Sequence, residues 1–358
     1  CALPIWGLDI EGHPLEVKDP FGRTCQTHAF SISGQLLKET NIDRGNRWTF
    51  ASVAGNPIRR WDQRNQTFRH QYDDLQRPTH LWVQIGAAAE ILLERRYYGE
   101  AAATPTVNNL RGQLIFLFDQ AGKVALTSFD FKGNLLAHSR KLATVYNANI
   151  DWSALAAITS PATAESTAAS GLESETFSEA REYDALNRIT KLTTPDNSQH
   201  IPGYNKAALL ETVDVKIRGA STATPFVRNI DYNEKGQRTK LEIGDASTVT
   251  TTTYSYDPFT FRLASLVTTR TSPSATLQSL SYTFDPVGNI VAIADSAQQT
   301  VFFDNSVVSA SQEFEYDALY RLKKATGREN NVAVANTQRD HNDMPINPLP
   351  HANDAAAV

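Results

Sequence analysis

The sequence predicts an all-β protein of short antiparallel strands with very little helix, and three observations carry this prediction. Turn signals rich in Gly, Asn, Asp and Pro recur at short intervals along most of the chain. The phrases between them, of about five to eight residues, are rich in β-forming residues, as in 113–118. A phrase with an aromatic-Asp pair also returns several times, which indicates a repeated structural unit.

Composition limits the class of protein. The 358 residues are 41% apolar and 20% charged, which is enough to bury a sizeable core. The net charge is −5 without a basic stripe, which counts against nucleic acid as the main partner. No apolar run approaches the roughly 18–20 residues of a membrane-spanning helix, so we expect no direct membrane insertion. The start shows no secretion signal.

No cofactor or metal is expected. Cys1 and Cys25 are too few for a disulfide framework or a four-cysteine zinc site. The eight histidines show no metal-ligand spacing. Phosphate-loop and nucleophile-elbow motifs do not occur either.

Composition and turn spacing divide the chain into sections. Residues 1–6 are expected to be a non-native end, and 7–152 a first section of β-sheet with turns such as 19–23 and 130–134. Within it, 86–95 has helix propensity, but 90–98 also fits a strand, and the surrounding turn spacing favours the strand. Residues 153–176 are dominated by Ala, Ser and Thr and predict a linker or surface excursion with a short helix.

Residues 177–329 predict a second section of β-sheet, and 330–358 an irregular tail leading into missing sequence. The repeat is clearest in this second section, where 183–189 and 316–322 share one phrase and a looser version stands at 72–78. The aromatic anchors, the turn acids after them and three associated residues are the structural positions that we single out: Tyr72, Asp73, Phe118, Asp119, Tyr183, Asp184, Arg188, Tyr204, Tyr232, Tyr256, Asp257, Phe284, Asp285, Gly288, Tyr316, Asp317 and Arg321.

One physical interpretation explains the phrase. The aromatic residue ends a strand with its ring on the covered face, and the next Asp or Asn accepts backbone N–H bonds in the turn. A Gly or Asn that follows takes the left-handed conformation. Four arginines then begin return strands where they can pair with a turn carboxylate: Arg188, Arg238, Arg262 and Arg321. One unit cannot bury its own face, so neighbours must dock side by side.

These phrases resemble the YD repeats, also called RHS repeats, and in particular the B/C components of bacterial Tc (toxin complex) insecticidal toxins. The stretches that carry the resemblance are 108–113, 118–122, 129–135, 254–258, 282–290 and 325–329. The resemblance covers nearly everything from about residue 9 to 329. It implies a long antiparallel sheet wound as a spiral into a hollow shell.

The resemblance also implies a function. Such a shell encloses a C-terminal toxic polypeptide until a pore-forming A component delivers it, so the expected partners are the remaining B and C parts, the enclosed toxin and the A component. The chain would be a non-enzymatic wall segment, made in the bacterial cytoplasm and released as part of a secreted virulence complex. The alternative is a YD-repeat surface or contact-dependent protein that binds carbohydrate or a neighbouring cell.

Catalytic interpretations are weaker than structural ones. Asp285-Pro286-Val287-Gly288 has the form that the family uses around self-cleavage, but a carboxylate dyad needs a second Asp nearby, and Asp257-Pro258 lacks the following x-Gly. We therefore interpret Asp257 and Asp285 as turn residues and expect the self-cleaving site downstream of this chain. A hydrolase with paired carboxylates is a third hypothesis. Of the tryptophans at 6, 48, 61, 82 and 152, the internal ones are expected in the core or lining the shell, not on a sugar-binding platform.

Overall fold

The computed structural model describes residues 5–19, 21–244, 247–303 and 306–328. It forms two compact units, unit 1 from 1 to 197 and unit 2 from 198 to 358. The expected tail at 330–358 and most of the expected non-native end lie outside the described residues, although Ile5 and Trp6 begin the first strand.

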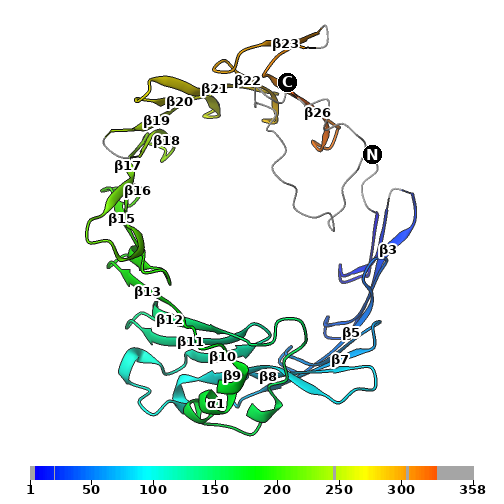
Figure 1. Ribbon diagram of the computed structural model, residues 1–358. Helices are drawn as coiled ribbons and strands as arrows, with labels where there is room; N and C mark the ends of the chain where they lie inside the picture. Colours follow the sequence, from blue (N-terminus) through cyan, green and yellow to red (C-terminus); the bar gives the residue numbers. More distant parts are fainter. Residues whose placement is uncertain (1–4, 20, 245–246, 304–305, 329–358) are drawn as a thin grey trace. The chain divides into compact units, whose positions relative to one another are not determined.

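Unit 1 is an antiparallel meander in which each strand pairs with the next one along the chain (Figure 1). Its strands are β1 (Ile5–Leu8), β2 (Pro14–Lys18), β3 (Thr24–Phe30), β4 (Leu36–Asn41), β5 (Gly45–Ala51), β6 (Pro57–Asp62), β7 (Gln66–Tyr72), β8 (Pro78–Ile85), β9 (Ile91–Tyr98), β10 (Leu114–Asp119), β11 (Gly122–Phe129), β12 (Leu135–Leu142), β13 (Phe177–Tyr183) and β14 (Ile189–Thr193). Its short helices are η1 (Gly99–Ala101), η2 (Val107–Asn109), η3 (Ser153–Leu155), α1 (Pro161–Ala168) and η4 (Ala169–Gly171).

Unit 2 repeats this architecture, with η5 (Ile217–Gly219) and a small separate hairpin, β23–β24, inserted before β25. Its strands are β15 (Gln199–Tyr204), β16 (Leu210–Lys216), β17 (Thr224–Tyr232), β18 (Arg238–Ile243), β19 (Thr250–Tyr256), β20 (Leu263–Arg270), β21 (Ala275–Phe284), β22 (Ile290–Asp295), β23 (Val301–Phe303), β24 (Ser306–Val308), β25 (Gln312–Tyr316) and β26 (Leu322–Thr326). The predicted all-β, antiparallel class with very little helix is confirmed.

The segment 86–98, which the sequence allowed as either a helix or a strand, contains a strand. β9 spans Ile91–Tyr98 and pairs with β8 on one side and β10 on the other. Tertiary pairing overrides the helix propensity of the preceding alanines. The alternation of fully buried Leu92 with less buried neighbours places this strand in the middle of the best-covered part of the sheet.

Residues 143–172, which we call the covering segment, overlap the stretch at 153–176 that was expected to be a linker or surface excursion with a short helix. They contain η3, α1 and η4 and pack on β8–β11 as a second layer (Figure 1). Trp152 is 4% exposed and its ring lies 5.4 Å from that of Phe118, which is fully buried. Ala164 and Ala168 face this core because side chains this small let α1 approach the sheet closely.

Polar side chains of the sheet bind the backbone of the covering segment. His80 Nε2 donates to the Ala156 carbonyl at 3.1 Å, and Arg95 donates to the Ile158 carbonyl at 2.9 Å. The Tyr97 hydroxyl also donates to the Ile158 carbonyl, at 3.1 Å. These bonds satisfy carbonyls that the short, irregular segment leaves without a strand partner.

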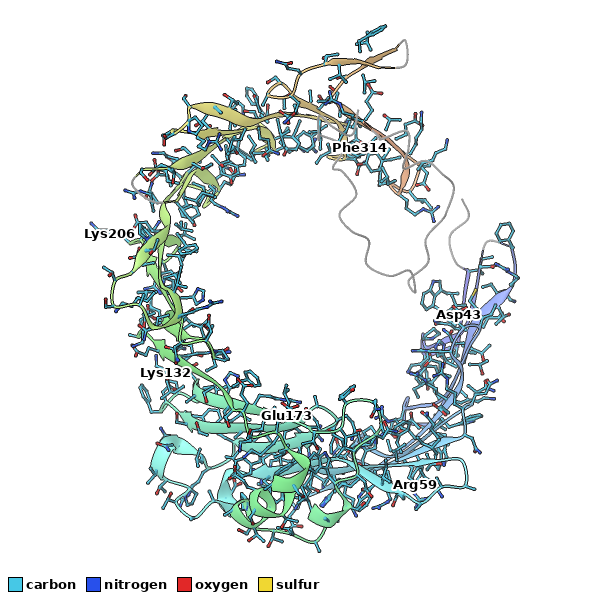
Figure 2. The ribbon with its side chains drawn as sticks, viewed as in Figure 1. Asp43, Arg59, Lys132, Glu173, Lys206 and Phe314 are labelled. Carbon is cyan, nitrogen blue, oxygen red and sulfur yellow. The ribbon has the colours of Figure 1, made fainter. Side chains whose placement is uncertain are left out.

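Unit 2 is thinner. Its strands form a single layer, and side chains stand off both faces (Figures 1 and 2). Among its described residues few side chains are buried; Val215 and Ile230 are the buried aliphatic ones. A sheet of this kind is stabilised mainly by cross-strand pairs and by contacts between neighbouring loops.

Candidate functional site

The turn acids form a recurring five-residue loop, and Asp184–Arg188 shows its geometry. The Asp184 N–H donates to the Arg188 carbonyl and the Asn187 N–H donates to the Asp184 carbonyl, both at 3.0 Å. The Asp184 carboxylate accepts the N–H groups of Leu186 at 2.8 Å and Arg188 at 3.0 Å. Its other oxygen accepts the Arg188 guanidinium at 2.7 Å. Asn187 takes a positive φ of 62°, which Asn tolerates better than most residues.

The same backbone pair of bonds closes loops at one edge of each unit, because alternate connections of a meander fall at the same edge. We call this the Asp-loop edge. Its unit 1 loops with this closure are 9–13, 31–35, 52–56, 73–77, 130–134 and 184–188, and its unit 2 loops are 205–209, 233–237, 285–289 and 317–321. The first residue of each is Asp, Asn or Ser, whose side-chain oxygen accepts later N–H groups of the loop.

Except for Phe118, each repeat anchor ends a strand next to a loop of this edge, with a bulge directly before it. The anchor pairs with the first residue of the return strand: Tyr72 with Pro78, Tyr183 with Ile189, Tyr204 with Leu210, Tyr232 with Arg238, Tyr256 with Leu263, Phe284 with Ile290 and Tyr316 with Leu322. The bulge lets the left-handed residue close a type I turn without splaying the strands.

Tyrosine hydroxyls connect successive loops. Tyr72 donates to the carbonyl of Pro57, which directly follows the preceding loop, at 2.8 Å. The equivalent bonds join Tyr98 to Pro78 at 2.9 Å, Tyr232 to Leu210 at 2.6 Å, Tyr256 to Arg238 at 2.8 Å and Tyr316 to Ile290 at 2.8 Å. Each bond fixes one hairpin to the hairpin before it.

The loop carboxylates are held in the charged form. Backbone N–H donation from Arg188 lowers the pKa of Asp184, partial desolvation opposes this, and the Arg188 guanidinium lowers the pKa further. At Asp73 desolvation acts most strongly and raises the pKa, but bonds from Arg77 outweigh it and the net shift is downward. The backbone N–H of Arg321 is the main cause that lowers the pKa of Asp317. These groups stabilise turns and are poor proton donors.

Some predicted positions differ from the common loop. Phe118 is fully buried in the core of unit 1, and Asp119 begins a tight turn to Gly122 and pairs with Arg140 at 3.0 Å. Asp257 opens a loop one residue longer, closed by its N–H bond to the Arg262 carbonyl.

Two of the four arginines do not pair with the carboxylate of their own turn. Arg262 donates to the Asp285 carbonyl of the next loop, at 2.9 Å, because the longer loop displaces it. Arg238 lies over the Tyr254 ring at 6.0 Å, since Gln237 occupies the pairing position and its turn begins with the neutral Asn233. Arg188 and Arg321 form the expected ion pairs.

The suspected carboxylate dyad is not assembled. Asp285 accepts the N–H of Gly288 at 2.7 Å and the N–H and side-chain amide of Asn289 at 2.8 and 2.7 Å. Asp257 accepts the N–H and hydroxyl of Thr260. Hydrogen bonds within each loop outweigh desolvation and lower the pKa of Asp285, and bonds from Thr260 lower that of Asp257, whereas a shared proton requires one raised pKa.

A second titratable cluster lies in the first loop. Side-chain atoms of Asp9, Glu11 and His13 come within 4.8 Å of one another. Asp9 already accepts the N–H groups of both other residues, so the turn itself accounts for this cluster.

Sequence reasoning did not assign the loops that begin at Asp9, Ser31 and Ser52 to the repeat, although it predicted turns at 33–35 and 54–57. The signal was present, because these residues and Asp73 follow one another at intervals of 21 or 22 residues and a Gly or Gln stands three positions after each. Tyr98 was also missed, since its loop does not begin with an acid.

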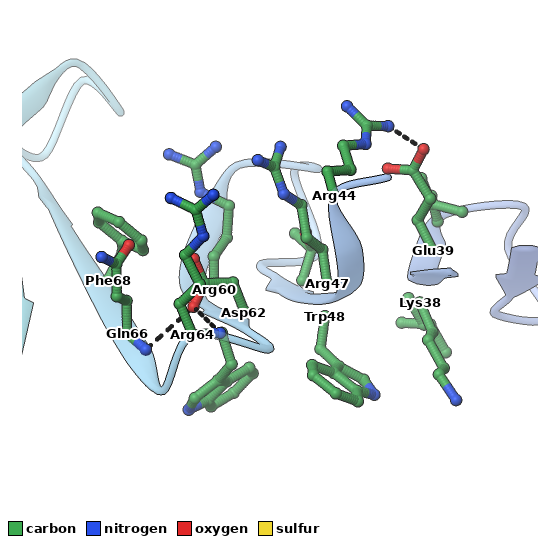
Figure 3. A pocket seen from close by; sticks show the side chains of 14 residues that line it. Lys38, Glu39, Arg44, Arg47, Trp48, Arg60, Asp62, Arg64, Gln66 and Phe68 are labelled. Atoms are coloured by element: carbon green, nitrogen blue, oxygen red, sulfur yellow. Dashed lines mark hydrogen bonds and ion pairs between the residues drawn. The ribbon is translucent and has the colours of Figure 1, made fainter. Parts of the chain in front are cut away.

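The sheet of unit 1 also carries a groove over β4–β7 that the sequence did not reveal. The groove has a volume of about 460 Å³. Figure 3 shows Arg44, Arg47, Arg60 and Arg64 pointing to one side of the sheet and Trp48 to the other. We call this the arginine groove. The available signal is the high density of arginine between residues 44 and 69. It is not apparent from the net charge of the whole chain, which is negative.

Comparisons with known proteins agree with the repeat architecture. No protein-family model matches the chain. The toxin subunit YenC2 of Yersinia entomophaga is 30% identical over 376 residues, which cover 96% of this chain and 37% of YenC2. YenC1 of the same organism is 26% identical over 322 residues, covering 88% of this chain and 31% of YenC1. The chain therefore spans about a third of the length of these relatives.

Solved structures show the same fold. The crystal structure of TcdB2-TccC3 matches with a TM-score of 0.81 at 25% identity, covering 98% of this chain and 17% of that chain. The Photorhabdus luminescens Tc holotoxin pore with the TccC3-D651A mutation matches with a TM-score of 0.78 at 25% identity, covering 91% of this chain and 15% of that chain. These relatives are named as toxin subunits and Tc toxin complexes, which favours a Tc toxin component over the surface-protein alternative. In its loops, its fold and its relatives, this chain resembles an RHS-repeat component of the Tc toxin B/C type.

Proposed function

We propose that this chain forms part of a wall, wound as a spiral, that encloses a toxic C-terminal polypeptide and keeps it inactive until delivery. The observation that carries the proposal is the Asp-loop edge. Bonds such as Tyr72 to Pro57 and Arg262 to Asp285 join each hairpin to its neighbour, so the sheet extends by repetition and does not fold back to form a pocket. A sheet that is a single layer throughout unit 2 suits a barrier between two compartments.

The partners in this proposal are the remaining B and C parts of the shell, the enclosed polypeptide and a pore-forming A component. Support comes from the names of the solved relatives, which pair TcdB2 with TccC3 and include a Tc holotoxin pore. The complex would act outside the bacterium that makes it. Among the described residues, none of the helices reaches the length and apolar character needed to span a bilayer.

Self-cleavage is assigned to a site downstream of this chain. Asp257 and Asp285, the candidates within it, have lowered pKa values and serve their own loops. The wall then contributes by steric exclusion, and release of the toxic segment inside it is left to a separate carboxylate pair.

The test uses the full-length protein that contains this chain. After purification, the segment that follows the repeats should resist protease until the wall is unfolded, and it should become accessible when the A component is added. Asp→Asn changes downstream should abolish release of a C-terminal piece, whereas Asp285→Asn should leave release unchanged. Digestion of the C-terminal segment at the same rate in native and unfolded protein would refute enclosure.

A further inference from the structure

The arginine groove carries more positive charge than its surroundings neutralise. Arg44 is paired with Glu39. The other nearby acid, Asp62, accepts the N–H groups of Arg64 and Gln66 at 3.0 Å each and so caps the turn between β6 and β7. Within the part of the chain that the structure describes, neither Arg47 nor Arg64 forms an ion pair. Two guanidinium groups therefore remain available on this face.

The strand register places these charges close together. Arg47 on β5 stands opposite Asp62 on β6, and Arg60 is two residues before Asp62 on the same face. Diagonal neighbours of this kind lie about 7–8 Å apart. Arg64 follows in the loop, so the guanidinium groups form a row across neighbouring strands (Figure 3).

The two carboxylates that line the groove, those of Glu39 and Asp62, offset only part of this row of positive charge. Arg60 Nε donates to His70 Nε2 at 3.2 Å, which requires the ring to be neutral. Burial and the Arg60 cation lower the pKa of His70 to about 4, so this ring adds no charge at neutral pH. Like charges this close repel, and an anionic partner would relieve the repulsion.

The remaining lining indicates which anion fits. Leu37 and Phe68 lie among the groove residues, so it has apolar contact surface beside its donors. A free phosphate uses no apolar surface, and a nucleic acid needs a longer basic stripe than this single groove on a chain of net charge −5. Arginine forks match carboxylates in two-point geometry. An extended polypeptide with both acidic and apolar side chains on one face, where every second residue points the same way, uses both features of the groove.

We propose that the arginine groove over β4–β7 binds a short extended polypeptide segment rich in Asp and Glu, through Arg47, Arg60 and Arg64. This goes beyond enclosure by a passive wall, since it gives the wall a specific contact for acidic chain. The proposal does not rest on enclosure, because the isolated chain is enough to test it.

The experiment measures, by anisotropy, binding of a fluorescently labelled peptide that repeats Glu-Glu-Leu-Leu and so has both side-chain types on each face when extended. Wild-type chain should bind it, with an affinity that falls as salt rises, and should not bind a lysine-leucine peptide of equal length. Arg47→Glu and Arg60→Glu should each weaken binding by about tenfold or more. Arg64→Glu, a change in an exposed loop with little risk to folding, should do the same.

Arg59→Glu is the matched control. Arg59 is adjacent to Arg60 on β6, is exposed, and points to the opposite face of the sheet, so it should leave binding unchanged. Equal loss in the Arg59 variant, or no glutamate-peptide binding by wild-type chain below about 1 mM, would overturn the proposal. Tighter binding of inorganic pyrophosphate or of an oligonucleotide than of the peptide would overturn it too, by assigning the groove to phosphate.

Discussion

The hydroxyl of Tyr72 lies 2.8 Å from the carbonyl oxygen of Pro57, to which it donates a hydrogen bond. Tyr72 ends β7 and Pro57 begins β6, so the bond reaches from one loop to the exit of the loop before it. The aromatic position of the repeat thus has two roles: its ring contributes packing and its hydroxyl fixes the spacing of hairpins.

Replacing this tyrosine should lower stability without changing the fold. Tyr72→Phe keeps the ring and removes the donor, and the expected loss is about 1 kcal/mol in the free energy of unfolding, measured by urea denaturation. Combining it with Tyr98→Phe in the neighbouring repeat should cost roughly twice as much. Tyr146→Phe is the control, since that side chain is 93% exposed and should change stability by less than about 0.5 kcal/mol. Equal effects at Tyr72 and Tyr146 would contradict the role of the hydroxyl.

Asp184 should be replaceable by Asn but not by Ala. Asn stands at the equivalent position in the loops that begin at Asn205 and Asn233, where its oxygen accepts the same backbone N–H groups. Asp184→Asn therefore loses only the ion pair with Arg188. Asp184→Ala loses every side-chain bond of the loop, and the amides of Leu186 and Arg188 should exchange hydrogen about tenfold faster. Equal exchange in the two variants would show that the side-chain oxygen is not required.

The loops were predictable because all their partners lie within five residues. An Asp, a left-handed residue three positions on and an Arg after it are visible in one short window, as in Asp184–Arg188. The targets of the tyrosine hydroxyls were not predictable, since Tyr72 and Pro57 are 15 residues apart and meet only when two hairpins pair.

The packing of the covering segment against the sheet escaped prediction for a related reason. The backbone of Leu92 bonds to the side chain of Asp151, 59 residues later, and the ring of Trp152 packs on Phe118. Ala, Ser and Thr are typical of linkers when considered alone, yet their small size is what lets Ala164 pack against the sheet. The arginine groove could not be predicted from the sequence either, because the face on which each arginine lies depends on strand register.

Exposed apolar loop tips should make the isolated chain associate. Along the Asp-loop edge of unit 1, Ile10, Ile32 and Val53 are 102%, 106% and 105% exposed relative to a free residue. The backbone of a type I turn does not require apolar residues there, and exposed apolar groups favour contact with another surface. Ile32→Asp combined with Val53→Asp should shift the chain from oligomer to monomer in analytical ultracentrifugation. Tyr146→Asp changes an equally exposed site elsewhere and should not.

A monomeric wild-type chain, or oligomers that persist in the double variant, would contradict this prediction. Persistence would assign association to the open edges of end strands such as β1 or β26, whose free backbone groups can pair with another sheet.

The covering segment should be essential to unit 1. Trp152→Ala removes a ring that is 4% exposed and should cost about 3–5 kcal/mol of unfolding free energy. Ala164→Leu should cost about 1–3 kcal/mol, because α1 has no space against the sheet at this fully buried position. Ala162→Leu on the exposed side of α1 is the control and should be nearly neutral. A true linker would tolerate all three changes, which urea denaturation would show directly.

Mild acid should loosen the covering segment through His80. Burial, and secondarily the cation of Arg95, lowers the pKa of His80 to about 4, so the folded ring stays neutral while its Nε2–H donates to the Ala156 carbonyl. Between about pH 4 and 6.5 the unfolded chain protonates this histidine and the folded chain does not. The unfolded state then binds more protons, so stability rises with pH across this window and falls on acidification.

The size and pH range of this stability change distinguish it from the effect of protonating the loop carboxylates. A shift of this magnitude corresponds to at most about 3 kcal/mol, and partial exposure of the ring reduces the expected loss between pH 7 and pH 5 to roughly 1 kcal/mol. The carboxylates of Asp73 and Asp184 have pKa values below 3.8, so their contribution is lost only at lower pH. His80→Gln keeps a donor for the Ala156 carbonyl and should flatten the slope of urea midpoint against pH between 5 and 7. His70→Gln should flatten it separately, since the pKa of His70 is also about 4, and an unchanged slope in both variants would refute the assignment.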